Sequence, residues 1–483
     1  MNVTKDSSAF LRHFTWYLSG AIFPLLLNFV KNPIFTRHYS AEDFGILGLV
    51  LISVGYLSTV LFSWLTSCLW RFYPKFKAEN NLNELYVHLL FLYVISGIIM
   101  LILAYFSGFF FENNQIIELI YLAAVHFIFR ELLNLYFIVL RLRGKSRDYN
   151  LLISIQTAVS FGLLLVLSFI FHLDISAMFY SLIIIDALFI LWIFLSFIRR
   201  KSSILLNFNR IKASTCKLLF GFGGKNLITT LILMLIVSSD RYIISLYEPM
   251  KEVGIYTKTY DVAQMSILAL IFIFFSTINP TMNHILENNR QDSRKIVSGY
   301  IHAFSFLFIP VVIFASIFSE EITEILLGAE FRSGYVLMPY IFISMLFFGV
   351  IKFFENEYKF AGKLGKMAIY FGIGLLVNLI LNFALIPIYG MIWAAISTLI
   401  SYAVILFIFA FNDNFAHFRR ENYNNRFWFL LLFTSLCVVV DFILRRWMEF
   451  DLVTSVLELS LFGILWFILF YKDIKSLKTP VFE

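Results

Sequence analysis

Long apolar runs separated by short polar breaks make up nearly the whole chain. A bilayer core roughly 30 Å thick needs about 20 apolar residues in a helix, and this length divides the chain into about fourteen segments. Their predicted bounds are 13–32, 44–70, 85–110, 116–140, 150–171, 176–198, 218–246, 254–284, 296–318, 334–358, 366–388, 390–411, 427–445 and 452–471. The pattern predicts an all-α polytopic membrane protein with short connectors, the longest near 199–217 and 319–333.

Two of the polar breaks resemble each other. "TRHYSAEDFGIL", from residue 36, and "YIISLYEPMKEVGIY", from residue 242, each contain a Tyr, then an acidic residue, then Gly-Ile. The next inner turn of each copy has a proline, Pro74 or Pro280, followed by Glu-Asn-Asn. Six spans separate the copies, and an even number preserves direction, so the pattern predicts parallel repeats related by an axis along the membrane normal.

This repeat predicts how the chain is organised. We expect two six-helix lobes, at residues 1–205 and 206–412, and two additional spans with a tail at 413–483. Two duplicated lobes favour an alternating-access transporter. Chance similarity between turns is the alternative.

Composition supports the membrane assignment. The chain is 60% hydrophobic and only 14% charged, with a mean hydropathy of +0.83, against about 45–50% apolar and about 25% charged residues in soluble domains. With the N-terminus placed in the cytoplasm, most of the 38 lysines and arginines fall on inner loops and tails, so both termini are expected to be cytoplasmic. The net charge of +7 then reflects topology and gives no support for nucleic acid as a partner.

Metal and cofactor chemistry have no support in the sequence. The three cysteines are scattered without a paired spacing, and the eight histidines show no HExxH spacing. We therefore expect no metal site and no cofactor.

Ionisable side chains within spans are costly and are functional candidates by default. Arg130 lies near the middle of the fourth span, and His126 and Asn134 share its helical face at spacings of four. Asn28 and Lys31 share a face of the first span, and Lys225 lies in the seventh. We predict a cationic cavity formed by these six side chains. The alternatives are a structural ion pair for Arg130 and lysines that extend to the lipid headgroups.

Other charged residues predict a gate and ion coupling. An outer-gate cluster is expected from Arg37, Asp240, Arg241, Lys258 and Asp261. Asp186 lies in mid-span with no charge near it in the sequence, and is a candidate for coupling transport to H+ or Na+. The alternative for Asp186 is a hydrogen-bonded packing residue, with Arg130 as one possible partner. Glu355 is expected to form ordinary helix ion pairs with Lys352 and Lys359.

Three stretches resemble a known family. They are "SGAIFPLLLNFVKNPIFTRHYSAEDFGIL", "SSDRYIISLYEPMKEVGIY" and "LLVNLILNFALIPIYGMIWAAISTLISY". Their order and spacing resemble Wzx-type polysaccharide (O-antigen) flippases of the multidrug/oligosaccharidyl-lipid/polysaccharide exporter superfamily. The resemblance covers about residues 10 to 411 and is weak over the last two spans.

The resemblance implies a V-shaped pair of lobes, as in multidrug exporters of this superfamily, in the bacterial inner membrane. The implied cargo is an undecaprenyl-pyrophosphate-linked oligosaccharide, moved from the cytoplasmic to the periplasmic leaflet among membrane lipids. The implied protein partners are a polysaccharide polymerase and a chain-length regulator. One alternative is a multidrug or organic-cation antiporter of the same fold. Another is a membrane polysaccharide polymerase or ligase, although no large outer loop is predicted to carry catalytic groups.

Overall fold

The computed structural model describes residues 23–24, 26–199, 211–288, 293–413, 416–418, 425–447 and 451–476. All regular elements within these ranges are helical, which confirms the predicted all-α class. Twelve of the described helices are long and apolar enough to cross a membrane. The predicted span at 116–140 corresponds to α4 (Asn114–Leu142), a 29-residue helix outside those twelve. The predicted span at 13–32 lies largely outside the described residues.

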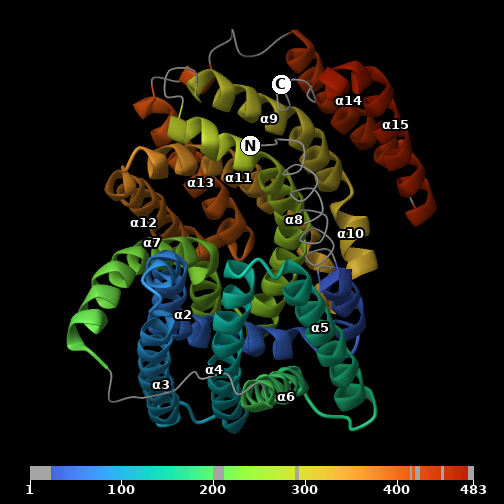
Figure 1. The fold of residues 1–483 in the computed structure, drawn as a ribbon. Coiled ribbons are helices and arrows are strands. Elements are labelled where there is room, and N and C mark those ends of the chain that lie inside the picture. Colours follow the sequence, from blue (N-terminus) through green and yellow to red (C-terminus); the bar gives the residue numbers. More distant parts are fainter. Residues whose placement is uncertain are drawn as a thin grey trace. The chain divides into compact units, whose positions relative to one another are not determined.

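One compact unit consists of residues 1–31 and 42–238. Its further helices are α2 (Ala41–Ala78), α3 (Leu82–Ser107), α5 (Ser146–Phe169), α6 (Ala177–Arg199) and most of α7 (Ala213–Tyr247). Helix α4 packs against α3 and α6, and α5 packs against both α6 and α4 (Figure 1).

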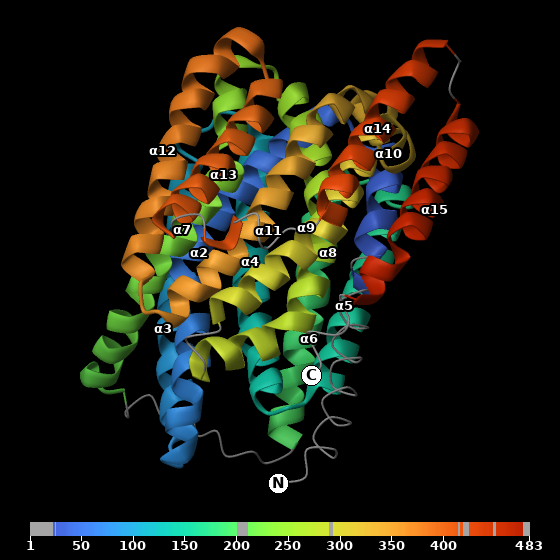
Figure 2. The ribbon, with the colours of Figure 1, turned by 90° about the horizontal axis from the view of Figure 1, so that it is seen from above.

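The second unit consists of residues 32–41 and 239–483. Its elements are α8 (Met250–Asn288), α9 (Ser293–Ile317), α10 (Ser319–Leu326), the 3-10 helix η2 (Ala329–Leu337), α11 (Met338–Phe360), α12 (Leu364–Tyr389), α13 (Ile392–Asn412), the 3-10 helix η3 (Ala416–Phe418), α14 (Asn425–Trp447) and α15 (Leu452–Ser476). Helices α11, α12 and α13 lie side by side (Figure 2). Helix α14 packs on α9 through a cluster that includes Phe306, Leu430 and Phe470 of α15.

Helix ends follow local sequence signals. Asn113 caps α4 by accepting a hydrogen bond from the Gln115 backbone N–H at 2.9 Å. Asp451 and Thr454 bond reciprocally at the start of α15, at 2.8 and 2.9 Å. Between α4 and α5 the turn passes through Gly144 at φ +72°, a left-handed conformation that glycine adopts without steric cost.

Residues 32–41, which include the start of the polar break that begins at residue 36, are an integral part of the second unit. The Thr36 hydroxyl accepts a hydrogen bond from the Gly328 N–H at 2.8 Å, and the Ala41 N–H donates to a carboxylate oxygen of Glu330 at 2.9 Å. Arg37 donates to the carbonyls of Glu324 and Ile325, at 3.1 and 3.3 Å, in the last turn of α10. Residues 36–41, from early in the sequence, therefore supply hydrogen-bond partners to groups between residues 324 and 330.

The structure corrects two sequence predictions. The inner turns expected at Pro74 and Pro280 begin later, because α2 continues through Pro74 to Ala78 and α8 continues to Asn288. The connector expected at 319–333 contains α10 and most of η2. Helices α2 and α8, the two that follow the similar polar breaks, are 38 and 39 residues long, and both run as far as a Glu-Asn-Asn sequence.

The compact units are bounded differently from the predicted lobes. The predicted boundaries at 205/206 and 412/413 stay predictions, whereas compactness divides the chain at 31/32, 41/42 and 238/239. Most of α7 belongs with the first unit because it packs on α2. The Tyr56 hydroxyl of α2 lies 2.8 Å from that of Ser238, and the Cys68 thiol donates to the Leu219 carbonyl at 3.2 Å.

Candidate functional site

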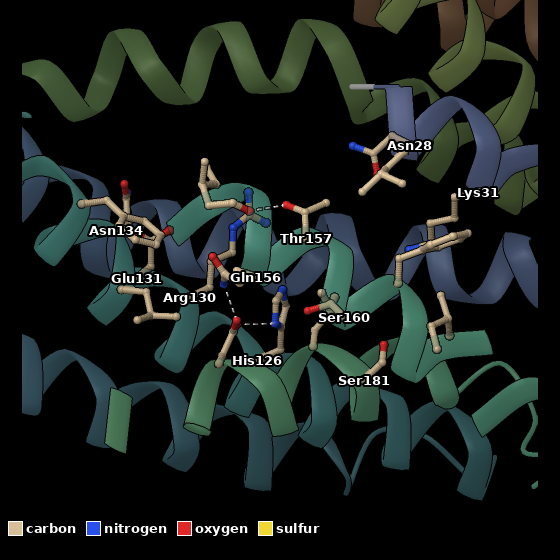
Figure 3. Close-up of a pocket in the computed structure, with 18 residues that line it drawn as sticks. Asn28, Lys31, His126, Arg130, Glu131, Asn134, Gln156, Thr157, Ser160 and Ser181 are labelled. Carbon is tan, nitrogen blue, oxygen red and sulfur yellow. Dashed lines mark hydrogen bonds and ion pairs between the residues drawn. The ribbon is translucent and has the colours of Figure 1, made fainter. Parts of the chain in front are cut away.

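A polar cavity of about 460 Å³ lies within the first unit. The side chains that line it come from helical residues 26–35 and from α4, α5 and α6 (Figure 3). The lining includes apolar side chains such as Phe137 and Leu164. Its polar side chains are Asn28, Lys31, His126, Arg130, Glu131, Asn134, Gln156, Thr157, Ser160, Ser181 and Asp186.

Helical periodicity brings the predicted residues together. His126, Arg130 and Asn134, spaced by four on α4, all line the cavity, as expected for residues on one helical face. Asn28 and Lys31, spaced by three, reach the same cavity from an earlier helical segment. Five of the six side chains predicted for a cationic cavity therefore lie around one space.

Arg130 carries the least compensated charge in this group. Its guanidinium carbon lies 5.7 Å from the centre of the Phe127 ring, and no described acid lies within ion-pair distance of it. A central arginine costs roughly 2.5–3.5 kcal/mol on insertion scales. Such a group favours an anion that enters the cavity.

Arg130 was the partner considered for Asp186 from the sequence, but the structure gives Asp186 other partners. It is 1% exposed, accepts a hydrogen bond from Gln156 Nε2 at 2.5 Å, and has a carboxylate oxygen 3.6 Å from His126 Nδ1. The latter distance allows an ion pair if the histidine is protonated, but is too long for a hydrogen bond. Gln156 and His126 contact Asp186, and this carboxylate forms no ion pair with Arg130.

Sequence reasoning missed part of the lining. Glu131 also lines the cavity, where it accepts a hydrogen bond from Asn134 Nδ2 at 3.3 Å. Gln156 and Ser160 on α5 were not identified. Their spacing of four along an otherwise apolar helix was the available signal.

Lys225 cannot be placed in this cavity. It belongs to α7, but its side chain lies outside the described part of the structure. Its role in cargo binding therefore stays a prediction.

The residues predicted for an outer gate form two groups in the second unit. Arg241 is buried, lies 3.3 Å from an Asp261 carboxylate oxygen, and stacks 5.0 Å from the centre of the Tyr260 ring. Asp240 accepts hydrogen bonds from the Tyr256 hydroxyl and the Arg241 N–H, and Lys258 lies close enough to Asp261 to interact with its charge. Arg37 is instead bonded to the end of α10. Their function as a gate stays a prediction.

The predicted ion pairs around Glu355 are confirmed. Its carboxylate oxygens lie 2.7 Å from the Lys352 ammonium and 2.5 Å from that of Lys359. All three residues are on α11, so this cluster neutralises charge within one helix.

Comparison with known proteins identifies the family. A family model described as polysaccharide biosynthesis protein matches residues 34–335, which is more than half of the chain. The chain belongs to this polysaccharide biosynthesis protein family. The match begins within residues 32–41 and includes α4, α5 and α6 with most of the cavity lining.

One curated relative of this family member is a probable low-salt glycan biosynthesis flippase, Agl15, from Haloferax volcanii. The two are 25% identical over 262 residues. The matched region is 54% of this chain and 53% of the relative, so the chain spans about half of that relative's length.

Solved structures show which fold this polysaccharide biosynthesis protein shares. The lipid II flippase MurJ in an inward closed conformation is 16% identical, with a TM-score of 0.72 over 95% of this chain and 99% of that chain. An inward-facing multidrug resistance transporter of the MATE family and MOP superfamily is 13% identical, with a TM-score of 0.64 over 83% and 94%. At these identities the likeness establishes the fold, which agrees with the architecture predicted from sequence.

Proposed function

We propose that this protein is a flippase for a lipid-linked oligosaccharide. The cargo is an undecaprenyl-pyrophosphate-linked repeat unit, such as that of O-antigen, moved from the cytoplasmic to the periplasmic leaflet of the bacterial inner membrane. Alternating access of the two lobes carries it, with both termini in the cytoplasm. A polysaccharide polymerase and a chain-length regulator are the partners expected to receive and use the product.

The observation that supports this proposal is the Arg130 guanidinium, which has no ion-pair partner among the described acids, in a cavity that also contains Lys31. A pyrophosphate is a compact anion, and arginine binds phosphate oxygens in a bidentate geometry. The amide and hydroxyl groups of Asn134, Gln156 and Ser160 are suited to sugar hydroxyls. The cavity volume falls within the range of about 300–1,000 Å³ usual for small-ligand sites.

A multidrug or organic-cation antiporter is the second candidate. It is favoured by the presence of Glu131 in the cavity and by the fold shared with a multidrug resistance transporter. Against it, both cavity acids already have partners, because Gln156 and His126 contact Asp186 and Asn134 donates a hydrogen bond to Glu131. A lipid-linked anion therefore fits the charge of the cavity better than an organic cation does.

Complementation of a flippase-null strain tests the proposal. Expression of the wild-type protein is expected to move the lipid-linked intermediate to the periplasmic leaflet, detected by access of a membrane-impermeant glycan-modifying enzyme to the sugar in intact spheroplasts. If the intermediate stays on the cytoplasmic leaflet while the same cells gain resistance to organic cations, the antiporter is favoured. If export is normal but polymer length changes, a polymerase or ligase role replaces transport.

Asp186 is our candidate for ion coupling. The Asp186→Asn variant keeps the size of the side chain and an oxygen that accepts from Gln156 Nε2, so we expect it to fold. It removes the ionisable group, and flipping in vesicles should lose its response to an imposed proton or sodium gradient. Asp148→Asn, which changes an exposed acid of α5 paired with Lys145, is the control expected to retain the response. An unchanged gradient response in Asp186→Asn would assign Asp186 a packing role only.

A further inference from the structure

A second charged cluster joins α10, α14 and α15 within the second unit. Arg445 Nε donates to a carboxylate oxygen of Asp441 at 2.6 Å, and Arg445 Nη2 donates to Glu321 Oε1 at 2.8 Å. The Ser455 hydroxyl donates to the same Glu321 oxygen at 2.6 Å. These contacts attach the two C-terminal helices to the short helix α10.

Glu458, one turn after Ser455 on α15, lies beside this network without a hydrogen bond. Its side chain is nine-tenths buried, at 7% exposure, and both carboxyl oxygens are buried without a hydrogen-bond partner in the described part of the chain. The second carboxylate oxygen of Glu321, Oε2, is also buried and unpartnered. Asp441 and Glu321 lie close enough to Glu458 for their charges to interact. Three buried acceptor oxygens in one cluster therefore lack a donor.

The charges in the cluster do not balance. Three carboxylates, those of Glu321, Asp441 and Glu458, lie around the single guanidinium of Arg445. The side chains of α9 packed here, such as Phe314, are apolar, and Cys437 of α14 is part of the same apolar cluster. Burial of unpaired carboxylates beside one another is unfavourable, so the cluster requires at least one further positive charge.

A proton satisfies this requirement better than a metal ion does. No group of acids, histidines and cysteines among the described residues is arranged to hold a metal. A proton taken from water converts one Glu458 oxygen into a donor, and the resulting O–H bonds to an Asp441 oxygen. Two carboxyl groups can share one proton in this way.

We propose that Glu458 and Asp441, with Glu321 and Arg445 beside them, form a proton-binding site that holds α15 against α14 and α10. With the proton bound, Glu458 is a neutral donor and Asp441 keeps its bond to Arg445. Loss of the proton to water places two like charges next to each other and weakens the attachment of α15. None of these four residues lines the cargo cavity, and the proposal is independent of the identity of the cargo.

Infrared difference spectroscopy on the purified full-length protein tests this site. The wild-type spectrum should contain the carbonyl stretch of a protonated carboxylic acid that shifts in D2O, and the difference from Glu458→Gln should show that this band is lost. Glu320→Gln, the same change at an exposed acid of α10, should leave the band intact. Persistence of the full band in Glu458→Gln would overturn the proposal.

The pH dependence of thermal unfolding provides a second readout. Because the folded wild type holds a proton that a glutamate in the unfolded chain releases above about pH 4, its unfolding midpoint should fall as pH rises from about 4 to about 7. Glu458→Gln should lose this part of the dependence and be the more stable form at the upper end. If that variant does not fold, Asp441→Asn serves instead, with the same loss of the band. A wild-type profile parallel to that of the variant contradicts the proposal.

Discussion

Replacement of Arg130 by alanine is expected to reduce flipping by about 10- to 100-fold while the protein still folds. A hydrogen bond to a charged group contributes about 1.5–3 kcal/mol, and about 1.4 kcal/mol corresponds to a factor of ten. Arg130 has no ion-pair partner among the described acids, so its removal leaves no buried carboxylate unpaired. Thermal stability should therefore change little. The measurement is the initial rate of flipping of the lipid-linked cargo in reconstituted vesicles.

Two variants make this experiment specific. Arg130→Lys keeps the charge but loses bidentate geometry, so we expect an intermediate rate. Arg71→Gln removes an arginine at the exposed end of α2, away from the cavity lining, and should leave the rate unchanged. A wild-type rate for Arg130→Ala would exclude Arg130 from cargo binding and weaken the case for an anionic cargo.

Gly328→Ala is expected to destabilise the second unit strongly. A Cβ at this position would lie 2.0 Å from the Thr36 carbonyl oxygen and 2.7 Å from its carbonyl carbon. The backbone of Gly328 is extended, at φ −68° and ψ 163°, so the effect is steric and does not arise from backbone strain. Overpacking of a well-packed site costs typically about 1–3 kcal/mol, and here backbone atoms must move.

The measurement is the unfolding midpoint of purified protein in detergent, which should fall together with the yield. Gly372→Ala is the matched control, because no atom lies within 4 Å of a Cβ built at this α12 glycine. Alanine is favoured over glycine within helices by about 1 kcal/mol, so this variant should be as stable as the wild type or more so. Equal midpoints for Gly328→Ala and the wild type would show that Thr36 does not pack on Gly328.

Periodicity explains what could be predicted from the sequence. Apolar runs of sufficient length identify helices, and a spacing of four identifies residues on one face, which is why His126, Arg130 and Asn134 were expected together. Periodicity within one helix does not say which helices are neighbours. The bond between Gln156 of α5 and Asp186 of α6 therefore could not be derived.

Short elements escaped prediction for a related reason. Helix α10 has eight residues, including two glutamates in its first turn, so it resembles a polar loop when apolar length is the criterion. Glu458 was missed because one acid near the start of an apolar span looks like an interfacial residue. Only the packing of α14 and α10 around it makes its environment unusual.

Because residues 32–41 belong to the second unit, expressing the polypeptide as two separate fragments would remove part of that unit. A fragment beginning after residue 205 would carry α8 to α15 but lack Thr36 and Arg37, leaving the Gly328 N–H and the α10 carbonyls without these partners. Such a half should be recovered in folded form only when the complementary piece is synthesised in the same cell. Reassembly in trans would then depend on ten residues that the first piece donates to the second.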